Sequence, residues 1–166
     1  MHMNLFLARH AKAREGYPDS TRELSKSGAA ALRLLCQRLD AETFSEVSQI
    51  WHSPYLRAAK TAEILAEEMN LKVELKTVEG ARPDDDPFQM ARAIADFTAR
   101  GGGLMLVSHN PFVEILSGIL VGEAPNCRTA FKTSTIAGYR LCEPPSIANP
   151  FGLWTLGMLV SPAVLH

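Results

Sequence analysis

The sequence has few cysteines and no long apolar run. Its three cysteines, Cys36, Cys127 and Cys142, are odd in number and widely spaced, so the CxxC spacing of a zinc or redox site is missing. We expect reduced thiols, buried or half-buried, in a cytoplasmic protein. No stretch of about 18 apolar residues could cross a membrane. The N-terminus lacks the basic segment and apolar core of a signal peptide, so we expect no membrane association and no secretion signal.

An excess of charge is also absent. Lys and Arg number 17 and Asp and Glu number 18, which gives a formal net charge of −1. A general nucleic-acid binder would need a large basic excess, so we expect no nucleic-acid partner. A local basic pocket is still compatible with this balance, because net charge does not report clustering. There is no internal repeat or linker, and 166 residues with 46% hydrophobic content suit a single domain over residues 1–166.

Apolar patterns predict strands that alternate with helices. The order β-α-β-α-β-α-β-α-β-β predicts a three-layer α/β/α fold, with a mainly parallel sheet, helices on both faces and an antiparallel strand pair near the C-terminus. The strand over residues 71–78 alternates polar and apolar residues and is predicted to lie at a sheet edge. The other strands are predicted at residues 3–8, 47–52, 104–108, 138–142 and 152–160. The helix starts are predicted at Ser25 or Ser27, at Ser53 as N-cap before Pro54, at Asp86-Pro87 and at Asn110-Pro111.

Three of the predicted strands end in a cation or an imidazole. The carboxyl ends of parallel strands meet at one edge of a sheet, where ligands bind, and helix N-termini there add amide donors. A pocket of arginines and histidines at such an edge suits a tetrahedral dianion, because the planar guanidinium binds two oxygens at once. The side chains concerned are Arg9 and His10 after the first strand, Arg57 after the second and His109 after the fourth.

Each polar feature also has an ordinary explanation. A lone Arg or His near a strand end is usually solvated or part of a cap, and we expect His52 to be structural. The glycines at 101–103 precede a strand, so we expect them to end a helix and not to bind phosphate. The acidic run 84–86 is expected to be a solvated loop with a helix cap, and we expect no metal site. The recurrence at three strand ends is what favours a functional site.

The motifs that carry these residues resemble those of the histidine phosphatase superfamily, which has the phosphoglycerate mutase-like fold. Residues 7–11 (LARHA) look like its Arg-His-Gly signature, residues 53–61 (SPYLRAAKT) are similar to its Ser-x-x-x-Arg-x-x-x-Thr motif, and residues 107–109 (VSH) match its second catalytic histidine. The short length and segment 22–28 (RELSKSG) most resemble the small SixA-type phosphohistidine phosphatases. Ala11 stands where the family usually has Gly, which is tolerable if its φ is not positive.

The resemblance implies a phosphatase that needs neither metal nor cofactor. It implies that His10 is the nucleophile and forms a phosphohistidine intermediate, with its other ring nitrogen donating to a backbone carbonyl. His109 is expected to be protonated among the phosphoryl oxygens. The other candidates are Arg9 and Arg57 as phosphate ligands, Arg22 as a phosphate ligand or a part of the rim, and Glu79 as the proton donor, with Asp84 to Asp86 as substitutes.

The sequence offers no clear proton donor for the leaving group, and this favours one class of substrate. Phosphohistidine on a protein fits, because its leaving nitrogen is easily expelled, whereas an ester leaves as an alkoxide and needs a placed proton. Short loops suggest an open pocket that could admit a protein side chain. Two alternatives stay open: a small-molecule phosphomonoesterase of the same family, and a non-catalytic phosphate-binding regulatory module on this fold.

Overall fold

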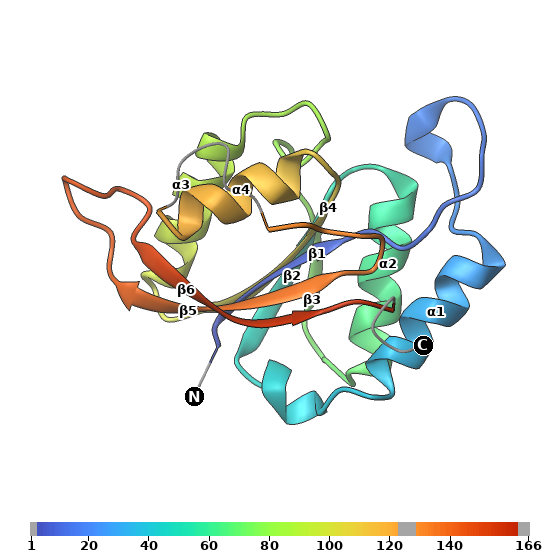
Figure 1. The fold of residues 1–166 in the computed structure, drawn as a ribbon, viewed down its shortest axis with the longest axis horizontal. Helices are drawn as coiled ribbons and strands as arrows, with labels where there is room; N and C mark the ends of the chain where they lie inside the picture. Colours follow the sequence, from blue (N-terminus) through green and yellow to red (C-terminus); the bar gives the residue numbers. More distant parts are fainter. Residues whose placement is uncertain (1–2, 123–128, 163–166) are drawn as a thin grey trace.

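The chain forms one six-stranded sheet with helices on both faces (Figure 1). The computed structural model describes residues 3–122 and 129–162. The strands are β1 (Leu5–Arg9), β2 (Val47–His52), β3 (Glu74–Thr77), β4 (Gly103–Ser108), β5 (Ile136–Glu143) and β6 (Leu153–Val160). The helices are α1 (Lys26–Cys36), α2 (Leu56–Glu68), α3 (Pro87–Thr98) and α4 (Phe112–Leu120), with short 3-10 helices η1 (Asp19–Thr21) and η2 (Ala41–Phe44).

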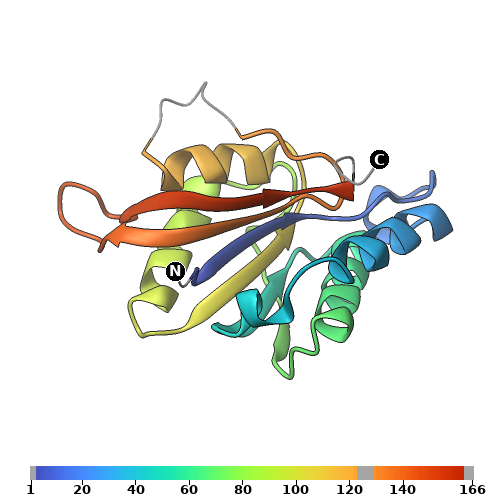
Figure 2. The same ribbon diagram turned by 60° about the horizontal axis from the view of Figure 1, so that its bottom comes forward.

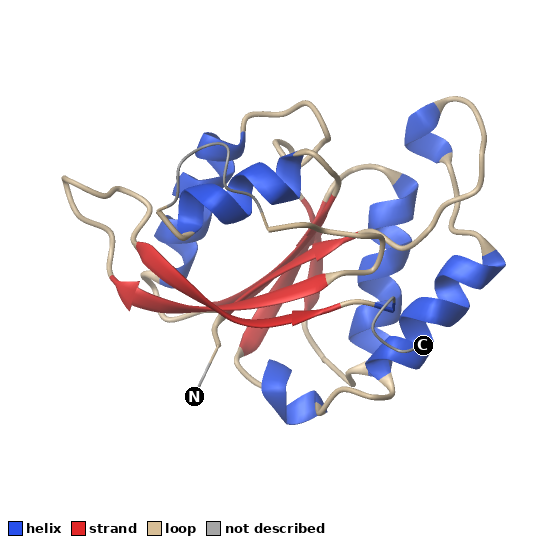
Figure 3. Ribbon diagram, in the orientation of Figure 1, coloured by secondary structure: helices blue, strands red, loops and turns tan. Residues whose placement is uncertain are grey.

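The sheet is parallel in its first four strands and antiparallel in its last two. The strand order is β3-β2-β4-β1-β5-β6. β1 and β4, β2 and β4, and β2 and β3 pair in parallel, whereas β5 runs antiparallel to both β1 and β6. Figure 3 shows the strands as one twisted layer between helices. The predicted fold class is confirmed, and β3 lies at the edge, as its alternating pattern predicts.

Two apolar cores pack against opposite faces of the sheet. Alternate residues of a strand point to opposite sides. Leu5 and Leu7 of β1 therefore belong to the core beneath α3 and α4, whereas Phe6 and Ala8 belong to the core beneath α1 and α2. All four side chains are buried. The turned view in Figure 2 shows α1 and α2 on one side of the sheet and α3 and α4 on the other. Burial on both faces explains why β1 reads as a continuous apolar run.

Helix α2 begins two residues later than predicted. The prediction of Ser53 as N-cap with Pro54 as first helical residue is wrong: the N-cap is Tyr55 and the first helical residue is Leu56. Ser53 lies just beyond β2 and is fully buried. Its hydroxyl contacts the ring of His109, 56 positions away. A local capping signal has been overridden by a tertiary hydrogen bond.

Other boundaries shift by a few residues. β1 begins at Leu5 and includes Arg9, and β3 covers only the second half of the predicted strand at 71–78. Leu71 and Val73 lie before β3 and pack against the core beside α1 and α2. The Asp86 cap and the first helical Pro87 of α3 are confirmed.

The cysteines differ in their surroundings. Cys36 on α1 is a buried free thiol, as predicted. The prediction of a buried or half-buried thiol is wrong for Cys142, which is exposed because β5 loses its cover after its first four residues. Cys127 lies outside the described residues. Within the described ranges, no helix is long and apolar enough to span a membrane.

Candidate active site

Three neighbouring strands bring the candidate residues to one edge of the sheet. Arg9, the last residue of β1, pairs in register with Ser108, the last residue of β4. The backbone pairing continues past the strands, since the His10 amide donates to the Ser108 carbonyl over 3.0 Å. The Ser53 amide, just after β2, likewise donates to the Val107 carbonyl over 3.0 Å. The segments that carry the three motifs are therefore fixed side by side by main-chain hydrogen bonds.

His10 is held in one tautomer. Its Nδ1 lies 2.7 Å from the Ala11 carbonyl oxygen, which can only accept, so Nδ1 carries the hydrogen and donates it. Nε2 therefore keeps its lone pair, and it accepts a hydrogen bond from Nε of Arg57 over 3.3 Å. Burial, and then the charges of Arg57 and Arg9, lower the pKa of His10 to about 4. At neutral pH the ring is an uncharged acceptor among arginines.

Ala11 fits where the related family usually has glycine. Among the described residues, positive φ angles at non-glycine positions occur at Asn70 and Ser134, so Ala11 is not strained. The Ala11 amide donates to Thr61 Oγ1 over 3.0 Å. The Thr61 hydroxyl donates in turn to the Arg57 carbonyl over 2.7 Å. The threonine of the second motif thus connects the backbone of the His10 segment to the first turns of α2.

His109 is also uncharged and can present a free donor. Its ring centroid lies 5.0 Å from that of His10, and its Nε2 lies 2.8 Å from Ser53 Oγ. The Tyr55 amide donates to the same Oγ over 3.3 Å, and the Ser53 hydroxyl can still either donate to Nε2 or accept from it. In the tautomer in which the hydroxyl donates, the ring hydrogen sits on Nδ1, a buried atom without a hydrogen-bond partner in the described part of the chain.

The charge expected on His109 is not favoured by its surroundings. Burial, and then the neighbouring His10 and Arg57, lower the pKa of His109 to about 3. The sequence suggested a protonated ring among phosphoryl oxygens. A neutral ring in the tautomer to which Ser53 donates still offers one N–H to an oxyanion.

The two arginines of the site are held by different partners. Arg57 is 4% exposed, and its terminal nitrogens donate to the carbonyl and the carboxylate of Asp19 over 2.7 and 3.0 Å. Nη1 of Arg9 donates to the Phe131 carbonyl over 2.8 Å, whereas its buried Nε has no partner in residues 3–122 and 129–162. Burial lowers the pKa of Arg9 and the nearby Glu114 opposes this, but a guanidinium remains charged at any ordinary pH. Both arginines therefore keep positive charge beside His10.

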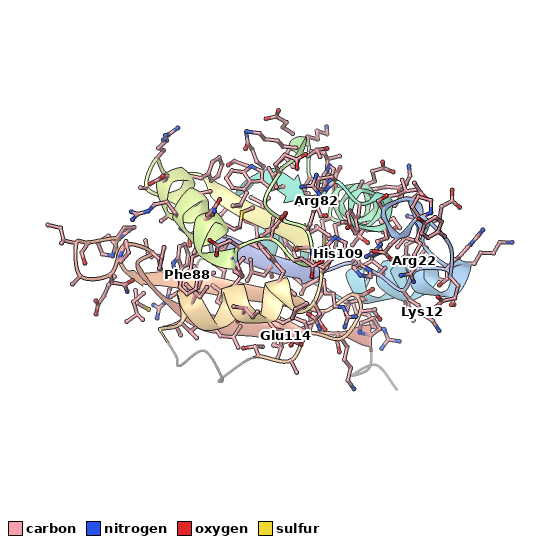
Figure 4. The ribbon with its side chains drawn as sticks, turned by 90° about the horizontal axis from the view of Figure 1, so that it is seen from above. Lys12, Arg22, Arg82, Phe88, His109 and Glu114 are labelled. Atoms are coloured by element: carbon pink, nitrogen blue, oxygen red, sulfur yellow. The ribbon has the colours of Figure 1, made fainter. Side chains whose placement is uncertain are left out.

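The two remaining candidates lie further out. Arg22 donates from Nε to the Arg14 carbonyl over 2.7 Å and from Nη1 to Asp19 over 2.9 Å, so it shapes the loop after β1. The Glu79 carboxylate is 73% exposed, and its ion-pair partner in the described residues is Arg82. In the view of Figure 4, His109 lies between Arg82 and Arg22. Whether Arg22 binds phosphate or only shapes the rim stays a prediction, as does the role of Glu79 as proton donor.

Sequence patterns missed two residues of the site. Asp19 lies in the irregular loop between β1 and α1, where no periodicity marks it, and it binds Arg57 across 38 positions. The local sequence around Ser53 predicts a helix cap, whereas its place in the Ser-x-x-x-Arg motif is the signal for a second role, the contact with His109. Within the described ranges, no group of three or more His, Cys, Asp or Glu residues could hold a metal ion.

Comparisons with known proteins identify a family and similar structures. The model of the histidine phosphatase superfamily (branch 1) matches residues 5–82. Over 144 residues the chain is 30% identical to the phosphohistidine phosphatase SixA of Escherichia coli (strain K12), covering 85% of this chain and 87% of that protein. The structure of the protein histidine phosphatase SixA complexed with tungstate is similar with a TM-score of 0.83 at 28% identity, over 98% of this chain and 99% of the other.

A more distant similarity concerns the fold alone. A phosphoserine phosphatase from Entamoeba histolytica, in complex with 3-phosphoglyceric acid, has a TM-score of 0.66 at 16% identity, covering 95% of this chain and 96% of the other. The same fold therefore occurs in a protein named for a phosphate ester, so the fold does not by itself identify a substrate.

Proposed function

Because the chain belongs to the histidine phosphatase superfamily, we propose that it is a phosphatase that removes the phosphoryl group from phosphohistidine on a protein, through a covalent intermediate on His10. One observation carries this proposal. The buried His10 ring donates from Nδ1 to the Ala11 carbonyl and keeps the Nε2 lone pair at neutral pH. A neutral imidazole with a fixed lone pair beside guanidinium groups is what in-line attack on a phosphoryl group requires.

In the first step, Nε2 of His10 attacks phosphorus. The His10 lone pair gives up its hydrogen bond from Arg57 Nε and forms the new N–P bond, while the bond to the leaving group breaks and its electron pair goes to the leaving atom. Arg57 lies beside Nε2, and Arg9 has a buried Nε that finds no partner among the described residues. These two, with the N–H of His109 Nδ1, bind the equatorial oxygens on which charge is redistributed.

In the second step, water attacks the phosphorylated His10. The N–P bond breaks, orthophosphate forms, and His10 recovers its lone pair. Through both steps the Nδ1 hydrogen stays on the His10 ring and is donated to the Ala11 carbonyl. This hydrogen bond stabilises the imidazolium that forms on phosphorylation. When the N–P bond breaks, the ring becomes neutral again. No metal or cofactor takes part, because guanidinium groups supply the positive charge.

A phosphohistidine substrate is supported by the relatives and by the site. The SixA sequence and the SixA structure described above carry the names phosphohistidine phosphatase and protein histidine phosphatase. The acid expected to protonate an alkoxide, Glu79, is largely exposed and pairs with Arg82. A leaving group that needs no placed acid fits this arrangement better than an alkyl ester does.

The test compares two substrates with the same enzyme preparation. p-Nitrophenyl phosphate and a histidine-phosphorylated carrier protein are incubated with the wild type and with His10→Ala, and orthophosphate release is followed. We expect turnover of both substrates by the wild type and none by the variant, together with an acid-labile phosphoenzyme in rapid-quench samples. Efficient release from p-nitrophenyl phosphate but not from the carrier protein would favour a small-molecule phosphomonoesterase. Phosphate binding without any turnover would favour a non-catalytic module.

A further inference from the structure

A carboxylate occupies the mouth of the site, although the motifs do not include it. Asp19 begins η1 in the loop between β1 and α1. Its Oδ2 accepts from Nη2 of Arg57 over 3.0 Å, and its Oδ1 accepts from Nη1 of Arg22 over 2.9 Å. The side chain is 53% exposed. Asp19 thus bridges two arginines and still presents one side to incoming molecules.

The orientation of Arg57 places Asp19 on the outer side of the nucleophile. Nε of the guanidinium faces Nε2 of His10, and the two terminal nitrogens face Asp19. Because the guanidinium is planar and rigid, His10 and Asp19 lie at opposite ends of one flat group. In-line transfer puts the leaving group on the side of phosphorus away from His10. A leaving group therefore departs along the side of Arg57 where Asp19 lies.

The charge of Asp19 limits what it can do there. The hydrogen bond from Arg22, and then that from Arg57, lower the pKa of Asp19, so the carboxylate is ionised at neutral pH. It has no proton to give to a departing alkoxide. It can accept a hydrogen bond from a cationic N–H, which is a strong type of hydrogen bond.

Phosphohistidine supplies such an N–H. When the phosphorylated ring is protonated, one nitrogen carries phosphorus and the other carries hydrogen. The P–N bond then breaks with its electron pair moving to the ring, whose positive charge is cancelled, and the second nitrogen keeps its proton. The leaving group departs as neutral imidazole, and no proton from the enzyme is needed. On the other side of phosphorus, His10 passes through the same change with its N–H on the Ala11 carbonyl.

We propose that Asp19 accepts the ring N–H of the departing imidazole and thereby selects phosphohistidine over phosphate esters. Asp19 would accept a hydrogen bond from the leaving ring, as the Ala11 carbonyl accepts one from His10. The phosphoryl group would then pass between two imidazole rings, each of which donates its N–H to an acceptor. This role rests on the proposed phosphohistidine phosphatase function and makes Asp19 a specificity-determining residue.

The test measures kcat/KM of the wild type and of Asp19→Ala on two substrates. One is a histidine-phosphorylated carrier protein, and the other is p-nitrophenyl phosphate, whose phenolate leaves without a proton and offers no N–H. We expect Asp19→Ala to lose about ten- to a hundredfold more kcat/KM on the carrier protein than on p-nitrophenyl phosphate, as for a hydrogen bond to a charged group. Asp19→Asn, which keeps an acceptor without its charge, should fall between. Arg57 keeps its hydrogen bond to the main-chain carbonyl of residue 19 in both variants.

Glu15→Ala provides the matched control. Glu15 belongs to the same loop, also faces Arg22 and is fully exposed, so both substrates should be turned over as by the wild type. Equal losses of Asp19→Ala on the two substrates would show that Asp19 acts only by holding Arg57, and unchanged rates would show no role; either result overturns the proposal. A wild type that hydrolyses p-nitrophenyl phosphate but not the phosphorylated carrier would overturn the phosphohistidine function and this role together. Circular dichroism confirms that each variant is folded.

Discussion

The stability of the fold should depend on pH through His10. The pKa of His10 is about 4 in the folded protein and close to 6.5 for a histidine in the unfolded chain. Between these values the unfolded chain binds a proton that the folded protein does not bind. The free energy of unfolding contributed by a neutral His10 is therefore fully present above pH 6.5 and is lost as the pH falls towards 4. At about 1.4 kcal/mol per pH unit, this loss amounts to about 3 kcal/mol.

The variant His10→Asn isolates this contribution. The asparagine amide does not titrate, but its N–H₂ group can replace Nδ1 as the donor to the Ala11 carbonyl. Urea unfolding at pH 4 to 8, followed by the fluorescence of the buried Trp51 and Trp154, gives the free energy of unfolding of both proteins. We expect the wild type to lose about 3 kcal/mol more than the variant between pH 7 and 4. Parallel pH curves for the two proteins would refute the view that burial and arginines hold His10 neutral.

Three further changes test the rest of the site. Arg57→Ala should lower kcat on p-nitrophenyl phosphate about a hundred- to a thousandfold, since an oxyanion donor is lost. Arg57→Lys should recover little of the lost activity, because lysine lacks the planar fork. Near-normal rates would exclude Arg57 from the transition state. Ser53→Ala should free Nε2 of His109 and shift the tautomer of its ring, which ¹⁵N chemical shifts of the ring report. The missing hydrogen bond should also lower kcat about tenfold. An unchanged ring spectrum would contradict the proposed tautomer. Glu79→Gln should leave phosphohistidine turnover within about twofold, as for an exposed surface change, and a large loss would instead support Glu79 as the proton donor.

The parts of the site that could be predicted from sequence are those fixed by regular structure. Arg9 ends a strand that is buried on both faces and His10 follows it, while His109 follows β4, so parallel pairing is enough to place them at one edge. The fold class followed from the same alternation of strands and helices. The position of Arg57 is predicted less directly, because α2 begins later than its capping signal indicates. The arginine still lies in the first turn of the helix.

The parts that could not be predicted depend on contacts between distant segments. Asp19 sits in an irregular loop, and its role appears only when η1 is placed against Arg57, 38 positions away. The local sequence around Ser53 is fully explained by a helix cap. The residue that competes for its hydroxyl, His109, follows a different strand, β4. Loop residues and residues with two available partners carry no periodic signal, so the sequence does not predict the charge network around Asp19.

The arginines of this site have two effects on His10 that act in opposite directions. Together with burial, which has the larger effect, their charge lowers the pKa of His10 and keeps its Nε2 unprotonated, but the same field weakens an uncharged ring as a nucleophile, since attack places positive charge on it. In the proposed mechanism a bound phosphoryl dianion offsets that field, so His10 would become a competent nucleophile only with the anion in place beside Arg57 and Arg9. The same change applies to His109, whose pKa is lowered by burial and then by His10 and the arginines, and would be raised by an anion. Selectivity for phosphoryl groups and activation of the nucleophile would therefore be one electrostatic property of the proposed site.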